Sequence, residues 1–121
     1  HHRKLGLWVQ LGGHSDENWH TLEVSLQEAK EESGIPEFEI LSEEIFDLDV
    51  HTIPERKQEP AHVHYDVRFL LRAKEGYPLI RQKRESLNLK WIPIEEFFSN
   101  PLYKPLYRMG KKSLSFGKAT I

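Results

Sequence analysis

Two segments in which apolar and polar residues alternate constrain the fold of this chain more than any other feature. The first segment, residues 45–53, places Phe46, Leu48 and Val50 between Asp47, Asp49 and His51. The second segment, residues 62–69, places Val63, Tyr65, Val67 and Phe69 between His62, His64, Asp66 and Arg68. Because successive side chains of a strand point to opposite faces, each segment is predicted to be a β-strand with one apolar and one polar face. The link of residues 54–61 is short, so the two strands are predicted to pair antiparallel.

A helix is predicted to begin near Thr21, which can cap it. Its core-facing stripe has the spacing i, i+4 and i+7 and consists of Leu22, Leu26 and Ala29. Gly34 supplies the left-handed residue that ends such a helix, and Pro36 prevents it from continuing.

Further elements complete the predicted architecture. Residues 5–11 are rich in apolar side chains and end on Gly12-Gly13, which predicts a strand followed by a tight turn. Residues 87–92 are predicted to form a last strand, and residues 94–98 and 102–112 to be helical. Together these pieces predict a single α/β domain over residues 1–121, with a mixed β-sheet flanked by helices.

Composition limits the classes of protein to consider. The chain has 121 residues, of which 38% are hydrophobic and 30% charged, as is usual for a globular domain with a real core. A net charge of −2 gives no global attraction for long nucleic acids, so we expect none as partner. The chain contains no cysteine, which excludes disulfides and thiolate zinc sites and makes a cytoplasmic location the default expectation. No apolar run approaches the roughly 20 residues of a membrane span, so no membrane partner is expected.

Three glutamates on the predicted helix suggest a metal site. Glu28, Glu31 and Glu32 stand at i, i+3 and i+4, so their carboxylates project from one face and repel one another. Hard divalent cations prefer such oxygen ligands. The alternative is a solvated acidic face without a ligand.

With its flanking glycines, the segment of residues 13–35 resembles the Nudix box, whose pattern is G-x5-E-x7-R-E-U-x-E-E-x-G-U, with U an aliphatic residue. The matching residues are Gly13, Glu28, Glu31, Glu32, Gly34 and Ile35, with Ala29 as a small apolar residue at a U position. Two positions depart from the pattern, because Trp19 replaces the first glutamate and Gln27 replaces the arginine. Outside the box the resemblance extends loosely to Trp8 and to Glu85, which is followed by the Trp91-Ile92-Pro93 segment.

The resemblance implies a Nudix-type α/β/α sandwich and an activity. It implies a metal-dependent hydrolase that cleaves a pyrophosphate bond in a nucleoside diphosphate linked to another group. Mg²⁺ or Mn²⁺ would be held by the Gly12 carbonyl and by Glu28, Glu31 and Glu32. Glu85 would be a further metal ligand or the general base, although loop glutamates are common and Glu75 is a weaker rival. The catalytic residues would then be Glu28, Glu31 and Glu85.

The two departures leave a second function open. In the family the first glutamate is mainly structural, and the arginine orients the neighbouring glutamate. Their loss preserves the metal ligands but allows a nucleotide-binding module with weakened catalysis. The resemblance also implies that a homodimer is possible and that a further strand precedes His1. The pair His1-His2 is either part of a native strand or the end of a tag.

The polar faces of the two alternating segments supply the candidate substrate contacts. These candidates, together with one residue of the loop after Gly13, are His14, His51, His62, His64, Asp66 and Arg68. Three interpretations remain open for these faces: a solvated sheet face, a substrate cleft, or a dedicated transition-metal site. Among the aromatic residues, Trp8 and Trp91 are predicted to lie in the core. Trp19 is predicted either to stack on a base or to anchor its loop.

Overall fold

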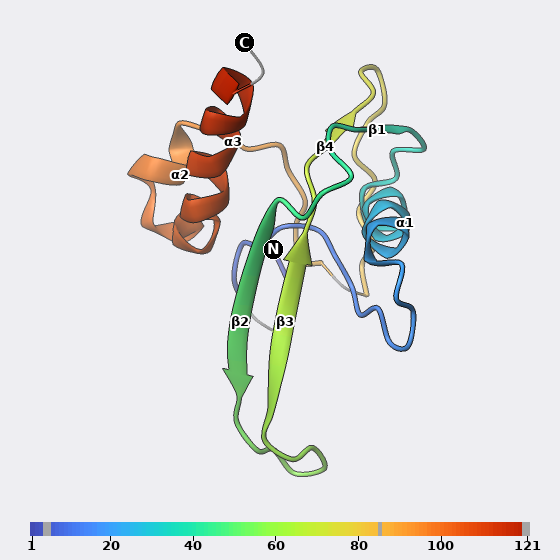
Figure 1. The fold of residues 1–121 in the computed structure, drawn as a ribbon, viewed down its shortest axis with the longest axis vertical. Helices are drawn as coiled ribbons and strands as arrows, with labels where there is room; N and C mark the ends of the chain where they lie inside the picture. Colours follow the sequence, from blue (N-terminus) through green and yellow to red (C-terminus); the bar gives the residue numbers. More distant parts are fainter. Residues whose placement is uncertain (4–5, 85, 120–121) are drawn as a thin grey trace.

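The computed structural model describes residues 1–3, 6–84 and 86–119. In this part of the chain one helix is followed by four strands and then by three helices (Figure 1). The elements are α1 (Thr21–Ser33), β1 (Phe38–Ile40), β2 (Asp47–Ile53), β3 (His62–Arg68), β4 (Leu71–Ala73), α2 (Glu96–Ser99), the 3-10 helix η1 (Pro101–Leu106) and α3 (Tyr107–Ala119). None of the described helices has the length and apolar character needed to cross a membrane.

The strands form two separate antiparallel pairs. Strand β1 pairs with β4, and β2 pairs with β3. The protein is therefore a mixed α and β protein with small antiparallel sheets. The prediction of one mixed sheet is wrong for the described strands, because no parallel pairing occurs among them.

The predicted β-hairpin is confirmed and is the longest sheet element. Asp47 lies opposite Arg68 and His51 lies opposite His64, so the polar side chains of β2 and β3 share one face. Figure 1 shows the hairpin as an arm that extends away from the helices, with the turn of residues 54–61 at its tip. The root of the arm, where β2 begins and β3 ends, lies nearest the rest of the protein.

Helix α1 begins and ends close to where the sequence predicts. His20, one residue before Thr21, occupies the N-cap position, and its side chain makes no capping bond. Gly34 ends the helix in the left-handed conformation with φ 76°, as predicted, and its N–H donates to the Lys30 carbonyl. Ala29 is buried, and the other two residues of the predicted stripe are half-buried.

Two predicted strands are not formed. The described residues 6–11 and residues 87–92 have no strand structure, and the isolated bridge between His2 and Ser86 lies before each of them in the chain. The N-terminal residue His1 still lies beside the start of the second region, because the Leu87 N–H donates to the His1 carbonyl over 2.7 Å. Strand structure requires a continued ladder of such bonds, and these regions do not supply it.

The core is small and lies away from the hairpin. Its buried apolar residues are Ala29, Ile35, Tyr103 and Leu106. Trp8 packs against Tyr103 with ring centroids 6.0 Å apart, as a core residue would. Trp91, by contrast, is 66% exposed, so its predicted place in the core is wrong.

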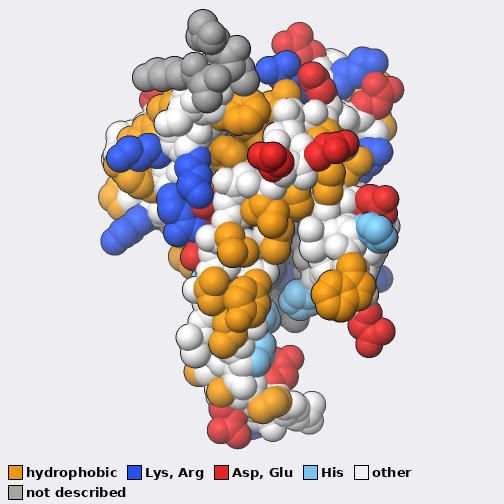
Figure 2. Space-filling view, viewed as in Figure 1, with side chains coloured by type: hydrophobic (Ala, Val, Ile, Leu, Met, Phe, Trp, Pro, Cys, Tyr) orange, Lys and Arg blue, Asp and Glu red, His pale blue; other side chains and the backbone are white. Residues whose placement is uncertain are grey.

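The apolar face of the hairpin does not join this core. Leu48, Val50 and Tyr65 are 52%, 53% and 68% exposed. Figure 2 shows hydrophobic side chains along the visible side of the arm. It is therefore the polar face at the root of the hairpin, and not its apolar face, that holds the arm to the protein through the ion pairs described below.

Candidate functional site

The glutamates predicted to hold a metal lie where the two glycines meet helix α1. The Gly12 N–H donates a hydrogen bond of 3.0 Å to the Glu32 carboxylate. A Cβ atom added at Gly13 would lie 2.5 Å from the carboxyl carbon of Glu28 and 2.7 Å and 2.8 Å from its oxygens. Only a residue without a side chain leaves room for the Glu28 carboxylate at this place. The two glycines and the glutamates of α1, which are separated in the sequence, are therefore in direct contact in the fold.

The third glutamate of α1 has a different environment. Glu31 is exposed, and its carboxylate accepts a hydrogen bond of 2.9 Å from the Gln27 side-chain amide one turn earlier. Gln27 stands where the Nudix pattern has an arginine, and its side-chain amide donates its hydrogen bond to Glu31. Glu28 is half-buried and Glu32 is buried at 9% exposure. The three carboxylates therefore range from buried to exposed along one edge of the helix.

The donor chemistry of this edge fits Mg²⁺ or Mn²⁺. Carboxylate oxygens and a backbone carbonyl are the ligands that hard divalent cations prefer. The space beside the Gly13 Cα atom, which a Cβ would fill, forms a cradle in which the backbone lies against the Glu28 carboxylate. Among the described residues, no three histidine, aspartate or glutamate side chains already stand in the arrangement of a bound metal ion. The predicted Glu85 lies outside the described residues.

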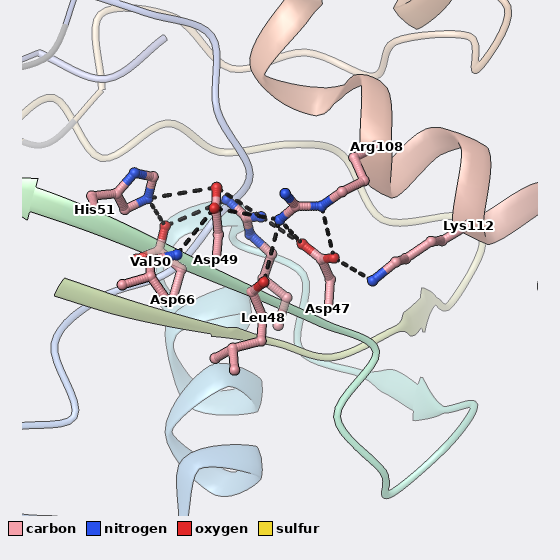
Figure 3. Close-up of polar contacts among 9 residues, drawn as sticks. Asp47, Leu48, Asp49, Val50, His51, Asp66, Arg108 and Lys112 are labelled. Carbon is pink, nitrogen blue, oxygen red and sulfur yellow. Dashed lines mark hydrogen bonds and ion pairs between the residues drawn. The ribbon is translucent and has the colours of Figure 1, made fainter.

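A second polar cluster lies at the root of the hairpin, and Asp47 is at its centre (Figure 3). The Asp47 side chain is fully buried. Its oxygens lie 2.6 Å from Arg68 of β3, 2.8 Å from Arg108 of α3 and 2.5 Å from Lys112 of α3. The hydrogen bond from Arg108, helped by those from Lys112 and Arg68, holds the pKa of Asp47 well below its usual range although burial alone would raise it. Asp47 is therefore ionised at neutral pH and ties the hairpin to α3.

Arg68, one of the predicted substrate contacts, belongs to this cluster. Its guanidinium contacts Asp47, Asp49 at 3.6 Å and Asp66 at 3.4 Å, and its side chain is only 10% exposed. The guanidinium is thus engaged in the protein's own ion pairs.

Arg108 and Lys112 are not among the residues predicted from the sequence. Their i, i+4 spacing marks a basic edge on α3, but nothing in that spacing indicates a partner about sixty residues earlier in the chain.

His51 and Asp66 form the next pair along the polar face. The His51 Nε2 atom lies 2.8 Å from the Asp66 carboxylate and 3.8 Å from Asp49. This pairing fixes the orientation of the imidazole ring. The His51 side chain remains 44% exposed, so it can still contact a ligand.

Three histidines meet nearer the tip of the hairpin. The Nε2 atoms of His62 and His64 are 3.1 Å apart, and the Nδ1 atom of His62 lies 2.8 Å from the Pro60 carbonyl. The His14 ring, from the loop after Gly13, contacts the His64 ring edge to face with centroids 5.7 Å apart. His14 thereby joins the glycine loop to the polar face of the hairpin. Figure 2 shows histidine side chains along the inner side of the arm.

Trp19 and two surface hollows lie apart from these contacts. Trp19 is 93% exposed, so in this structure its side chain is not packed as a loop anchor. One hollow is lined by β4 residues, Tyr77 and Trp91, and the other by His1, Trp8 and Pro105 among others. Glu75, the weaker rival of Glu85, lines the first hollow, and neither hollow is lined by the α1 glutamates or the hairpin histidines.

Comparisons with known proteins add no assignment. A scan of the chain against protein-family models finds no match, and a search of curated proteins finds no similar sequence.

Proposed function

We propose that this protein is a metal-dependent hydrolase that cleaves a pyrophosphate bond in a nucleoside diphosphate linked to another group. The observation that carries the proposal is the contact of Gly12 and Gly13 with the Glu32 and Glu28 carboxylates. A purely solvated acidic helix face needs no glycine against its carboxylates. At Gly13 the missing side chain lets the backbone approach the Glu28 carboxylate closely, which supports a role in metal binding.

The residues of α1 have distinct parts in this proposal. The Gly12 N–H orients Glu32, the open space at Gly13 positions Glu28, and the Gln27 amide orients Glu31. A bound Mg²⁺ or Mn²⁺ ion would neutralise the negative charge of the diphosphate and activate a water for attack on phosphorus. A protein with a net charge of −2 can then bind a polyanion through the metal alone.

The polar face of the hairpin supplies the other half of the proposed substrate site. His14 lies next to Gly13 in sequence and contacts His64 in space, so a ligand held at α1 would lie close to the hairpin. Neutral imidazoles can donate hydrogen bonds to phosphate or ribose oxygens. His51, oriented by Asp66, is one exposed candidate for this role, and His14 is another.

The decisive experiment is a screen of nucleoside diphosphate derivatives with Mg²⁺ and Mn²⁺, scored by release of the cleaved products. Glu28→Gln and Glu32→Gln should each lower turnover about 100-fold or more, since even partners of metal ligands typically contribute 10- to 100-fold. Glu23→Gln is the matched control, because Glu23 is an exposed glutamate in the first turn of the same helix. Unchanged turnover in Glu28→Gln and Glu32→Gln would refute the site.

A nucleotide-binding module with weakened catalysis is the alternative outcome. Gln27 in place of an arginine gives Glu31 a neutral partner where the pattern supplies a charge. Metal-dependent nucleotide binding without product over long incubation would establish that alternative. The same glutamate variants should then lose binding.

A further inference from the structure

We propose that His62 and His64 form a two-imidazole binding site for a transition-metal dication such as Zn²⁺, Ni²⁺ or Cu²⁺, separate from the carboxylates of α1. Both residues lie on β3 at i and i+2, so their rings project from the same face of the strand. Their Nε2 atoms are 3.1 Å apart. Two nitrogens bound to one tetrahedral metal are about 3.3 Å apart when each metal–nitrogen bond is about 2.0–2.1 Å. The spacing of the two nitrogens therefore already matches that of a chelate, and the rings have to turn so that both lone pairs face one ion.

The proton positions on His62 favour the same site. Its Nδ1 atom faces the Pro60 carbonyl at 2.8 Å, and a carbonyl can only accept, so Nδ1–H is the donor. In the neutral ring this leaves a lone pair on Nε2, the atom that faces His64. A hydrogen bond from Nδ1 to a backbone carbonyl is the usual way in which proteins orient a metal-binding histidine.

His64 can present its Nε2 lone pair as well. Without metal, His64 has to donate its Nε2 proton to His62 to make the contact of 3.1 Å. Moving that proton to Nδ1 through solvent gives the other neutral tautomer and frees Nε2 without a change of charge.

His14 is the natural third ligand. Its ring centroid lies 5.7 Å from that of His64, and the His62 and His64 centroids are 4.8 Å apart. Rings that share one metal have centroids about 5 Å apart, given metal–nitrogen bonds of about 2.0–2.1 Å. These two ring pairs are close to this spacing, but the three histidines are not assembled into a ligand group among the described residues. The two strand histidines are therefore the chelate, and His14 would have to move closer to complete it.

The ligand set determines which ions can bind. Imidazole nitrogen suits Zn²⁺, Ni²⁺ and Cu²⁺, with Cu²⁺ strongest in the usual order of affinity, whereas Mg²⁺ prefers oxygen. An excess of Mg²⁺ should therefore leave this site unaffected. This property separates it from the proposed carboxylate site on α1, and either site can fail without the other.

Calorimetric titration of the whole chain with Zn²⁺ in the presence of millimolar Mg²⁺ tests the site. We expect binding of one equivalent, weakened about tenfold or more by His62→Ala and by His64→Ala. His14→Ala should weaken it less. The matched control is His20→Ala, which changes an exposed histidine outside the cluster. A second control, His1→Ala with His2→Ala, tests chelation by the N-terminal pair.

Nitrogen NMR of the histidine rings distinguishes metal binding from a change in folding, because it reports which ring nitrogens bind the ion. Zn²⁺ should shift the Nε2 resonances of His62 and His64 and leave that of His20 in place. Wild-type affinity in both strand variants, or loss of binding in the His1/His2 variant alone, would overturn the proposal.

Discussion

Two carboxylate clusters in this protein lie in different settings. At the root of the hairpin, the fully buried Asp47 is bound by three cationic side chains from β3 and α3. On α1, Glu32 accepts from the neutral Gly12 N–H and Glu31 from the neutral Gln27 amide. Removing a charge from water is costly, and a buried carboxylate is stable only when its partners compensate that loss. The charges around Asp47 therefore serve to hold the fold together, whereas the α1 carboxylates are those proposed to bind an added cation.

The two ends of the hairpin also differ in the polar groups that they carry. Its root contributes Asp47 and Arg68 to the ion-pair cluster, while the part nearer the tip carries the histidine pair His62 and His64. One alternating pattern in the sequence thus serves two purposes. The distance from α3 decides which purpose applies, because only the root lies within reach of Arg108 and Lys112.

The largest effect should follow removal of the charge at the buried cluster. Asp47→Asn leaves three cations facing a neutral amide, so the free energy of unfolding should fall by about 3–5 kcal/mol. Asp49→Asn is the matched control, because Asp49 also approaches Arg68 and Arg108 but is 31% exposed. The control should lose about 1 kcal/mol or less. Urea denaturation measures both variants, and equal losses would remove the distinction between the buried and the exposed carboxylate.

The next effect concerns the cradle at Gly13. Gly13→Ala places a Cβ against the end of the flexible Glu28 side chain, which can move aside at little cost in stability. Mg²⁺ affinity should nevertheless fall about 10- to 100-fold, because a displaced ligand no longer points at the ion. Gly12→Ala is the control, since a Cβ there meets nothing within 4 Å and the N–H to Glu32 is retained. Should both variants bind Mg²⁺ alike, the contact with Glu28 has no part in metal binding.

Acid should weaken the Asp47 cluster. Because the folded pKa of Asp47 is lowered, its contribution to stability is complete above the unfolded value of about 4 and is lost as pH falls below it. Stability measured between pH 5 and 2 should therefore decline more steeply in the wild type than in Asp47→Asn. Parallel curves for the two proteins would contradict this assignment.

The smallest effect is expected at Gln27. Gln27→Ala removes the hydrogen bond of 2.9 Å to Glu31, and such i, i+4 pairs contribute about 0.2–0.5 kcal/mol to a helix. Thermal unfolding should hardly change, whereas the Mg²⁺ dependence of turnover should shift to higher concentration. A loss of stability comparable with that of Asp47→Asn would make Gln27 a structural residue.

Local features of the chain were predictable from its sequence. The end of α1 follows from the left-handed preference of Gly34, and the antiparallel hairpin follows from two alternating segments with a short link. The segregation of polar residues onto one hairpin face was also predictable, because side chains in a strand alternate. These features depend on residues close together in the sequence, where backbone preferences and periodicity decide.

Only the tertiary structure decided which face of the hairpin is held and which predicted strands form. The burial of Asp47 depends on Arg108 and Lys112, which meet it only after the chain has folded. The exposure of Leu48 and Tyr65 depends on what packs against the sheet, and residues 6–11 and 87–92 lack the hydrogen-bond ladder that would make them strands. Periodicity specifies which side chains share a face of an element. Whether that face is buried depends on the segment that packs against it, and that segment lies far away in the sequence.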